Sequence, residues 1–314
     1  MVFDRFPEKS MGPAGATLGI FESNDSSDCV GVADRFKFID DLSILEIINL
    51  LSVGICSFNI KQQVPNDIPS HNQFIPPENL KSQEWLKKIE QWTDDQKMVL
   101  NEKKTKTMIF NFTENHKFTT RLQLKNENIE VVKNTKLLGT IITDCLGWDL
   151  NTQNLVKRAN ARMELLRQIA SFGTHVDDLK IIYILFVRSL LEQSATVWHS
   201  SLTQENRDDL ERVQRSAIKV ILQEKYVSYK KGLAQLGLDS LDSRRDDLCL
   251  KFARKCVKKT KLKNMFPVNM KQHQMKTRDE EKFEVQHANT ERFKKSSIIY
   301  MQNLLNQHEQ NQKN

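Results

Sequence analysis

The sequence predicts an α+β fold, and three observations support this expectation. Strand-like segments gather before residue 146, whereas helical periodicity dominates from residue 151 onward. Gly and Pro are scarce, with 10 and 7 residues among 314. Hydrophobic residues make up 39% of the chain and charged residues 28%, a balance typical of a folded, helix-rich protein. The length allows two domains, or one domain with an extended appendage.

The first strands are expected in an apolar run that contains two adjacent carboxylates. Residues 36–60, which begin with FKFIDDLSILEIINL (36–50), are interpreted as two short strands, or a strand and a helix. A tight turn at Ile39, Asp40 and Asp41 would place both acids at its tip, where a divalent cation could neutralise them. A solvated turn between two core strands is the alternative, since paired Asp residues are common in turns.

The rest of the first half combines an irregular start, a helix and further strands. Residues 1–35 are predicted to be irregular, because GPAGATLG (residues 12–19) is rich in Gly and small residues. A helix with Trp85 on its apolar face is expected to begin near Ser82. Strands are expected in TKTMIFNF, RLQLKNENIEVV and TKLLGTIIT. Gly139 inside the last of them indicates a bulge or a close backbone approach.

The second half is predicted to be helical. Apolar residues recur near a 3.6-residue period, Thr203 is placed to cap a helix, and Gly173 and Gly237 are placed to end helices. The expected helices cover residues 151–173, 177–198, 203–222, 229–236 and 244–259, with a short one near 296–306. Residues 259–290 lose this periodicity and are expected to be loose.

The positive charge lies in the C-terminal quarter. From Ser243 onward there are 17 Lys and Arg against 8 Asp and Glu, whereas residues 1–242 hold 30 and 32. Residues 251–278 contain ten Lys or Arg and no acid. Such a block suits contacts with a phosphate backbone, and a solvated basic helix with a basic tail is the alternative. The candidate nucleic-acid-binding residues here are Lys251, Arg254, Lys255, Lys258 and Lys259.

Several classes of protein are disfavoured. Five scattered cysteines without CxxC spacing argue against a zinc site or a disulfide framework and favour an intracellular location, in the nucleus or cytoplasm. No apolar run reaches about 18 residues, so we expect no membrane partner. The N-terminus lacks the features of a secretory signal, so we expect a protein that is not secreted. The oligomeric state stays open.

Five segments, in order, resemble motifs of reverse transcriptases from non-LTR, jockey-like retrotransposons. GPAGATLGIF resembles the PQGTxLGPxLF motif, and FIDD resembles the F-x-DD turn of the palm. MVLNEKKTKTMIF after a Trp helix is similar to the L-N-x-x-K-T motif, and KLLGTIIT is similar to the YLGxxI hairpin that grips the primer. ARMELLRQ and the helices after it resemble the region that follows the palm. The likeness extends from about residue 12 to residue 222.

This resemblance implies a domain organisation and an activity. Residues 36–146 would form a partial palm of short antiparallel strands with a helix, 147–240 a helical thumb-like region, and 241–314 a basic, helical, partly disordered region. The family is an RNA-directed DNA polymerase that uses two Mg²⁺ ions, an RNA template and a DNA primer. Its pattern assigns residues as follows: Asp40 as main metal ligand, Asp41 as its helper, Lys104 beside the leaving pyrophosphate, and Gly139 at the primer.

The chain departs from the family pattern in ways that bear on activity. The family has another metal-binding Asp in an A-F-D strand well upstream of the PQG motif, whereas VFDRF with Asp4 lies only eight residues before Gly12. The basic fingers are missing, and Ala14 stands in place of the motif's glutamine. We therefore expect a C-terminal fragment from the late palm onward, with little or no polymerase activity by itself.

Three alternatives remain beside this interpretation. One is a non-catalytic module that binds nucleic acid through the basic C-terminal region, and another is an inert or protein-binding scaffold. The third starts from residues 92–143, which also resemble a small region of an AlkB-type repair and tRNA-modifying protein. His175 and Asp177 match the H-x-D start of its iron site. However, no jelly-roll strand series surrounds them, and His199 lies too near for the distal ligand, so His199 is expected to be a packed or surface residue.

Overall fold

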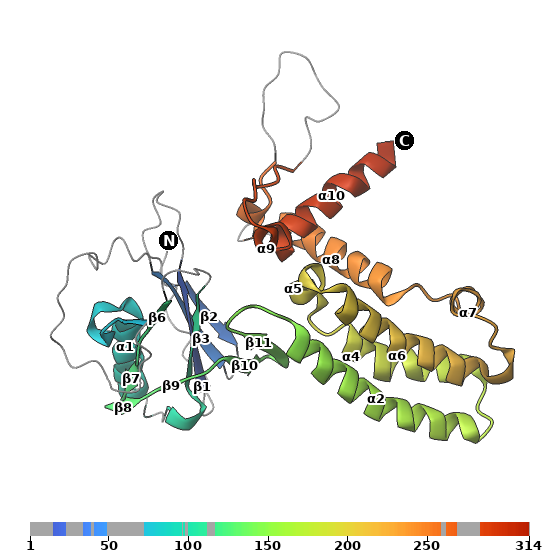
Figure 1. Ribbon diagram of the computed structural model, residues 1–314, viewed down its shortest axis with the longest axis horizontal. Coiled ribbons are helices and arrows are strands. Elements are labelled where there is room, and N and C mark those ends of the chain that lie inside the picture. The colour runs from blue at the N-terminus through green and yellow to red at the C-terminus, as the bar shows by residue number, and fades with distance from the viewer. Residues whose placement is uncertain are drawn as a thin grey trace, which may run out of the picture. The chain divides into compact units, whose positions relative to one another are not determined.

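The computed structural model of the chain divides into two compact units, Met1–Leu146 and Gly147–Asn314. The boundary between the units lies between Leu146 and Gly147, and the palm-like and thumb-like character of the two parts stays a prediction. The structure describes residues 15–22, 34–38, 41–48, 72–95, 97, 100–111, 117–258, 262–268 and 283–313 (Figure 1). This described chain is mostly helical with a few short strands, which is compatible with the α+β class expected from the sequence.

A five-stranded mixed sheet forms the centre of the first unit, in the order β2-β3-β1-β5-β9. Its strands are β1 (Gly15–Glu22), β2 (Asp34–Phe38), β3 (Asp41–Ile48), β5 (Lys106–Phe110) and β9 (Glu130–Val131). Only the β2–β3 pair is antiparallel; β1 pairs in parallel with both β3 and β5, and β5 pairs in parallel with β9. The expectation of short antiparallel strands is therefore wrong for three of the four pairs. Strand β2 runs opposite to both β1 and β3, so β1 and β3 run in the same direction and can pair in parallel.

Strand β1 differs from the prediction that residues 1–35 are irregular. Residues 15–22 instead lie at the centre of the sheet, hydrogen-bonded to β3 on one side and β5 on the other. Gly and Ala have low strand propensity, so the segment alone does not indicate a strand. Pairing along both edges decides its conformation, since it satisfies backbone groups that would otherwise need water.

Helix α1 (Lys81–Asp95) and short strand pairs complete the first unit. Gln83 ties α1 to the strand region, because its side chain donates to the carbonyl of Gln123 at 2.8 Å and accepts from that residue's N–H at 2.8 Å. The short strands are β4 (Asn72–Phe74) with β6 (Lys117–Thr119), and β7 (Gln123–Leu124) with β8 (Glu127–Asn128). The core beneath them consists of Ile75, Leu80, Leu86, Ile89, Leu100, Leu122, Leu124 and Ile129, with Trp85 packed against it.

The predicted strand around Gly139 is a hairpin of two strands, β10 (Asn134–Leu137) and β11 (Thr140–Thr143). Leu138 and Gly139 connect them with φ values of 48° and 87°. Two successive residues with positive φ are typical of a type I′ turn, whose twist matches that of antiparallel strands. Gly139 therefore serves a turn rather than a bulge within one strand.

The second unit is helical, as predicted. Its helices are α2 (Asp149–Ser171), α3 (Val176–Ile182), the π-helix η4 (Tyr183–Arg188), α4 (Ser189–Leu191), α5 (Ala195–Trp198), the 3-10 turn η5 (His199–Ser201), α6 (Gln204–Leu222), α7 (Tyr229–Leu236), α8 (Leu241–Lys258), α9 (Glu291–Lys294) and α10 (Ser297–Lys313). Thr203 caps α6 as expected, since its hydroxyl accepts from the N–H of Asn206 at 3.2 Å. Residues 259–261 and 269–282 of the predicted loose stretch lie outside the described residues.

The helix predicted over residues 177–198 is interrupted. A π-helical turn occupies its middle, and Ser194 has a φ of 53°, in the left-handed region. Trp198 is fully buried after this break, and its Nε1 donates to the carbonyl of Gln193 at 3.0 Å. The break thus turns Trp198 and the residue after it into the core, which continuous periodicity does not predict.

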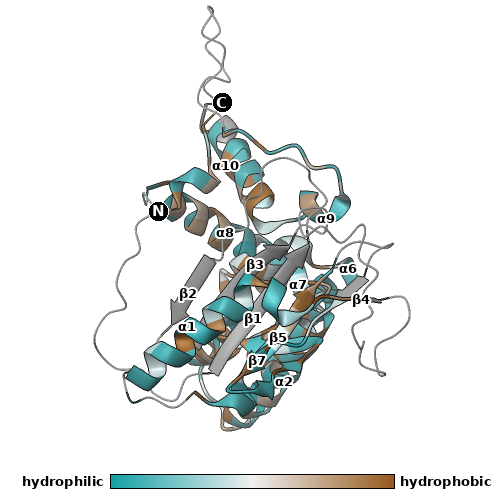
Figure 2. Cartoon of the chain, turned by 90° about the vertical axis from the view of Figure 1, so that its left-hand side faces the viewer, coloured by the Kyte–Doolittle hydropathy of each residue, from teal (hydrophilic) through white to brown (hydrophobic). Residues whose placement is uncertain are grey.

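One large apolar core fills the space among α2, α3, η4 and α6, and a smaller one joins α8 to α10. Hydropathy alternates along α1 and α10, as expected of helices with one apolar face (Figure 2). Among the described residues, no single helix has the length and apolar character needed to cross a membrane. One pair, Val176–Leu191 with Ala195–Ser201, has both when taken together, with a bend of 41° between its halves.

Candidate functional site

One of the two adjacent acids of the FIDD segment, Asp41, lies in strand β3. Asp41 is the first residue of β3 and pairs with Phe38 of β2 and Gly15 of β1. Strands β2 and β3 thus form an antiparallel pair, in which Asp41 belongs to β3 and not to the predicted turn. Asp40 lies outside the described residues, and the side chain of Asp41 is not described either. The predicted metal-binding role of the two acids stays a prediction.

Lys104 lies at the same edge of the sheet as Asp41. It ends the 3-10 turn η3 (Glu102–Lys104), is exposed, and precedes β5 by two residues. In the register of the sheet Thr17 pairs with Lys106, and Gly15, two residues earlier in β1, pairs with Asp41. Parallel strands start at a common edge, and two steps of about 4.8 Å separate β3 from β5. The three motif segments therefore meet at one edge of the sheet.

The cations predicted to contact nucleic acid share one face of α8. Lys251, Arg254, Lys255 and Lys258 are all exposed, and spacings of three, four and seven residues place them on one side of the helix. The opposite side carries Cys249, Ala253 and Cys256, which are buried against α10. We call the four cations the α8 stripe. Lys259 lies outside the described residues.

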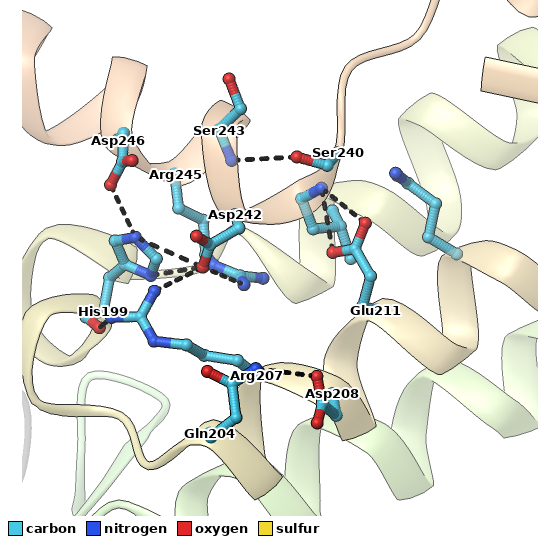
Figure 3. Close-up of polar contacts among 12 residues, drawn as sticks. His199, Gln204, Arg207, Asp208, Glu211, Ser240, Asp242, Ser243, Arg245 and Asp246 are labelled. Carbon is cyan, nitrogen blue, oxygen red and sulfur yellow. Dashed lines mark hydrogen bonds and ion pairs between the residues drawn. The ribbon is translucent and has the colours of Figure 1, made fainter. Parts of the chain in front are cut away.

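The sequence patterns do not indicate the polar network of the second unit that surrounds His199 (Figure 3). The ring is fully buried, Arg245 Nε lies 3.1 Å from its Nδ1, and Asp246 Oδ1 lies 2.8 Å from its Nε2. A guanidinium can only donate, so Nδ1 accepts, and Nε2 carries the proton that it donates to Asp246. The hydroxyl of Tyr300 on α10 donates to the same carboxylate.

Two more charged side chains, Arg207 and Asp242, belong to this network. Arg207 of α6 pairs with Asp242 and donates to the carbonyl of His199 at 3.0 Å. Arg245 Nη2 lies 3.6 Å from the Asp242 carboxylate, and its guanidinium lies 5.8 Å from the Trp198 ring centroid. These contacts join η5, α6 and α8, as the dashed lines of Figure 3 show.

Burial and hydrogen bonding set the protonation states of this network. Burial lowers the pKa of His199 below its ordinary value, the two nearby guanidiniums add to this, and the hydrogen bond to Asp246 opposes it. Burial alone would raise the pKa of Asp246, but the hydrogen bonds from His199 and Tyr300 outweigh it, so that pKa is lowered. The imidazole is therefore neutral and the carboxylate charged near neutral pH.

A metal ion does not fit this network well. One ligand atom from each of His199, Asp242 and Asp246 lies within 4.8 Å of the others, and this is the group of possible ligands found among the described residues. However, both imidazole nitrogens are already hydrogen-bonded, and the guanidiniums of Arg207 and Arg245 balance the two carboxylates. We conclude that the network connects helices. The sequence signal for it is the spacing of Asp242, Arg245 and Asp246, three and four residues apart on one helical face.

The pair that matched an iron-site motif has a local structural role. His175 is the N-cap of α3, and its Nδ1 accepts from the N–H of Asp177 at 3.3 Å. Both side chains are largely exposed. Within the described part of the chain, neither residue belongs to a group of three potential metal ligands.

Comparison with known proteins finds no relative for this chain. No family model matches it, and no curated protein or solved structure does so either.

Proposed function

We propose that this chain is a reverse-transcriptase-like segment, related to the RNA-directed DNA polymerases of non-LTR, jockey-like retrotransposons, and that it does not polymerise by itself. The sheet register supports the proposal, because the starts of β1, β3 and β5 share one edge. These strands contain or follow the PQG-like, FIDD and LNEKKT segments. Asp40 and Asp41 bind Mg²⁺ at this edge, and Lys104 supplies positive charge beside the leaving group. Such a protein would act inside the cell.

Loss of catalysis follows from the number of carboxylates. Two metal ions need acids that converge from separate strands. Of the metal-binding acids in the polymerase pattern, these 314 residues supply the FIDD pair. We therefore expect no primer extension on an RNA template with Mg²⁺. Robust extension that is abolished by Asp40→Ala would refute this part of the proposal.

Metal-directed cleavage tests whether the three segments form a binding edge. Fe²⁺ in place of Mg²⁺, with ascorbate and peroxide, generates radicals that cut the nearby backbone. We expect cuts close to Gly15, Asp41 and Lys104, suppressed by excess Mg²⁺ and lost when both Asp40 and Asp41 are changed to Asn. Cuts that survive this double change would contradict the assignment. The matched control is the same change at the exposed adjacent pair Asp94 and Asp95 in α1, which should leave the pattern intact.

A second function is favoured by the α8 stripe, namely binding of nucleic acid without catalysis. Four exposed cations within about two helical turns, Lys251, Arg254, Lys255 and Lys258, present positive charge along one line. Each phosphate neutralised in a single strand adds about 0.7 to the salt slope of log affinity, so four contacts predict a slope of roughly −3.

Charge removal at the stripe tests this function. Changing Lys251 and Lys255 to Ala should reduce the magnitude of the salt slope by about 1.4, measured by anisotropy with a labelled single strand. The same double change at the exposed Lys230 and Lys231 of α7 is the control, since it removes equal charge elsewhere in the unit. Equal loss in both variants would show that binding depends on net charge alone.

A further inference from the structure

A pocket lies beside the α8 stripe in the second unit. It has a volume of about 410 Å³, within the range of 300–1,000 Å³ that is typical of small-ligand sites. Its walls come from the end of α8, from α10 and from the segment before α9. The lining residues are Arg254, Val257, Lys258, Phe283, Leu305, His308 and Glu309.

The inner wall of the pocket is apolar and held in place. Phe283 is 9% exposed and Leu305 5%, and Val257 packs against the same small core. The backbone of Phe283 is fixed to α10 by two hydrogen bonds with the side chain of Asn306, which accepts from its N–H at 2.9 Å and donates to its carbonyl at 3.0 Å. The aromatic residue is therefore positioned before any ligand arrives.

The rim of the pocket carries excess positive charge. Arg254 and Lys258 contribute two cations against the single carboxylate of Glu309. Arg254 Nη2 donates to the ring of His308 at 2.9 Å, and because a guanidinium has five N–H groups, it keeps donors for a ligand. A planar guanidinium beside an ammonium suits a phosphate oxygen cluster.

We propose that this pocket binds a nucleotide, with its base against Phe283 and Leu305 and its phosphate between Arg254 and Lys258. The continuity of the pocket with the α8 stripe favours a nucleotide over other acidic ligands. Lys251 and Lys255 continue the line of positive charge from the rim along the helix. An unpaired nucleotide of a single strand would thus enter the pocket while the neighbouring phosphates follow the stripe. The inference rests on the nucleic-acid-binding function proposed above, and a free nucleotide offers the same chemistry.

The experiment compares three probes on the full chain: a labelled single strand, the corresponding duplex, and adenosine monophosphate. Val257→Phe places a larger side chain on the apolar wall, so it reduces the volume of the pocket without changing its charge. Lys258→Gln removes a cation from the rim. Lys251→Gln is the matched control, because it removes the same charge from the stripe outside the pocket. Thermal melting checks that each variant is folded. If Val257→Phe does not fold, Lys258→Gln still tests the pocket, because Lys258 is exposed and its replacement does not disturb the core.

We expect Val257→Phe to weaken single-strand binding by at least about fivefold, which is the smallest loss of affinity expected when one base no longer stacks. Its affinity for the duplex should stay within about twofold. Adenosine monophosphate should bind with an affinity that Lys258→Gln lowers and Lys251→Gln does not. Inorganic phosphate at equal ionic strength should compete poorly, because it lacks the base.

Each other outcome separates the two proposals. If Val257→Phe leaves strand binding unchanged and Lys258→Gln leaves the affinity for adenosine monophosphate unchanged, while Lys251→Gln weakens strand binding, the pocket is refuted and the stripe stands. If adenosine monophosphate binds and no strand does, the pocket holds a free nucleotide and the nucleic-acid function is refuted. If inorganic phosphate competes as well as the nucleotide, base recognition is refuted. Absence of binding by all probes refutes both proposals.

Discussion

Replacing Gly232 with Ala should destabilise the second unit, although Ala is the better helix former. Gly232 is buried in α7, where the helix packs closely on α6. A Cβ atom at this position would lie 2.6 Å from Cγ2 of Ile218 and 3.3 Å from Cδ1 of Leu222. The first distance is shorter than the contacts that non-bonded carbon atoms make in proteins, and Ile218 is itself fully buried, so either its side chain or one of the two helices has to shift.

The magnitude follows from two opposing effects. Ala in place of Gly gains about 1 kcal/mol in helix propensity. Overpacking of a well-filled core costs about 1–3 kcal/mol, and the 2.6 Å contact with a branched buried side chain places Gly232 toward the upper end. We therefore expect a net loss of about 1–2 kcal/mol in the free energy of unfolding.

Chemical denaturation followed by far-UV circular dichroism measures this change. The informative control is a double-mutant cycle with Ile218→Ala, which removes the clashing methyl group. Ile218→Ala alone should cost about 2–5 kcal/mol. In its background Gly232→Ala should become neutral or stabilising. Stabilisation of about 1 kcal/mol by Gly232→Ala in the otherwise unchanged chain would refute the close packing of α7 on α6, because that is the gain expected at an open helical site.

Three further predictions concern a titrating group, a helix cap and a turn. Because the folded pKa of His199 is lowered, the unfolded chain binds a proton that the folded chain does not, so stability should be full above pH about 6.5 and fall as the pH drops below it. Denaturation at several pH values measures how the free energy of unfolding changes with pH. The same pH dependence in His199→Gln would contradict the role of His199. Thr203→Ala should cost about 1 kcal/mol through loss of the α6 cap, observable as a lower denaturation midpoint. Gly139→Ala should destabilise the β10–β11 hairpin by about 1 kcal/mol, because a side chain is disfavoured at a φ of 87°. Leu138→Asn, which creates an Asn-Gly turn, should stabilise the hairpin. If Gly139→Ala raised the free energy of unfolding and Leu138→Asn lowered it, the turn assignment would be contradicted.

Local patterns in the sequence were sufficient for many helices and for the basic stripe. The expected helix at 229–236 is α7, and Thr203 and Gly237 cap helices as predicted. The cations at residues 251, 254, 255 and 258 share a helical face because their spacing follows the helical period. These features depend on interactions between residues a few positions apart, which the sequence contains directly.

Tertiary contacts decided the rest. Pairing with β3 and β5 makes residues 15–22 a strand, although their composition indicates a loop. The turn of the chain at Ser194 buries His199 against Asp246, which is 47 positions away. The sequence by itself thus determined the helical half and its charged face. The parallel sheet and the buried ionic network depended on contacts between distant segments, because their hydrogen-bond partners are brought together only by folding.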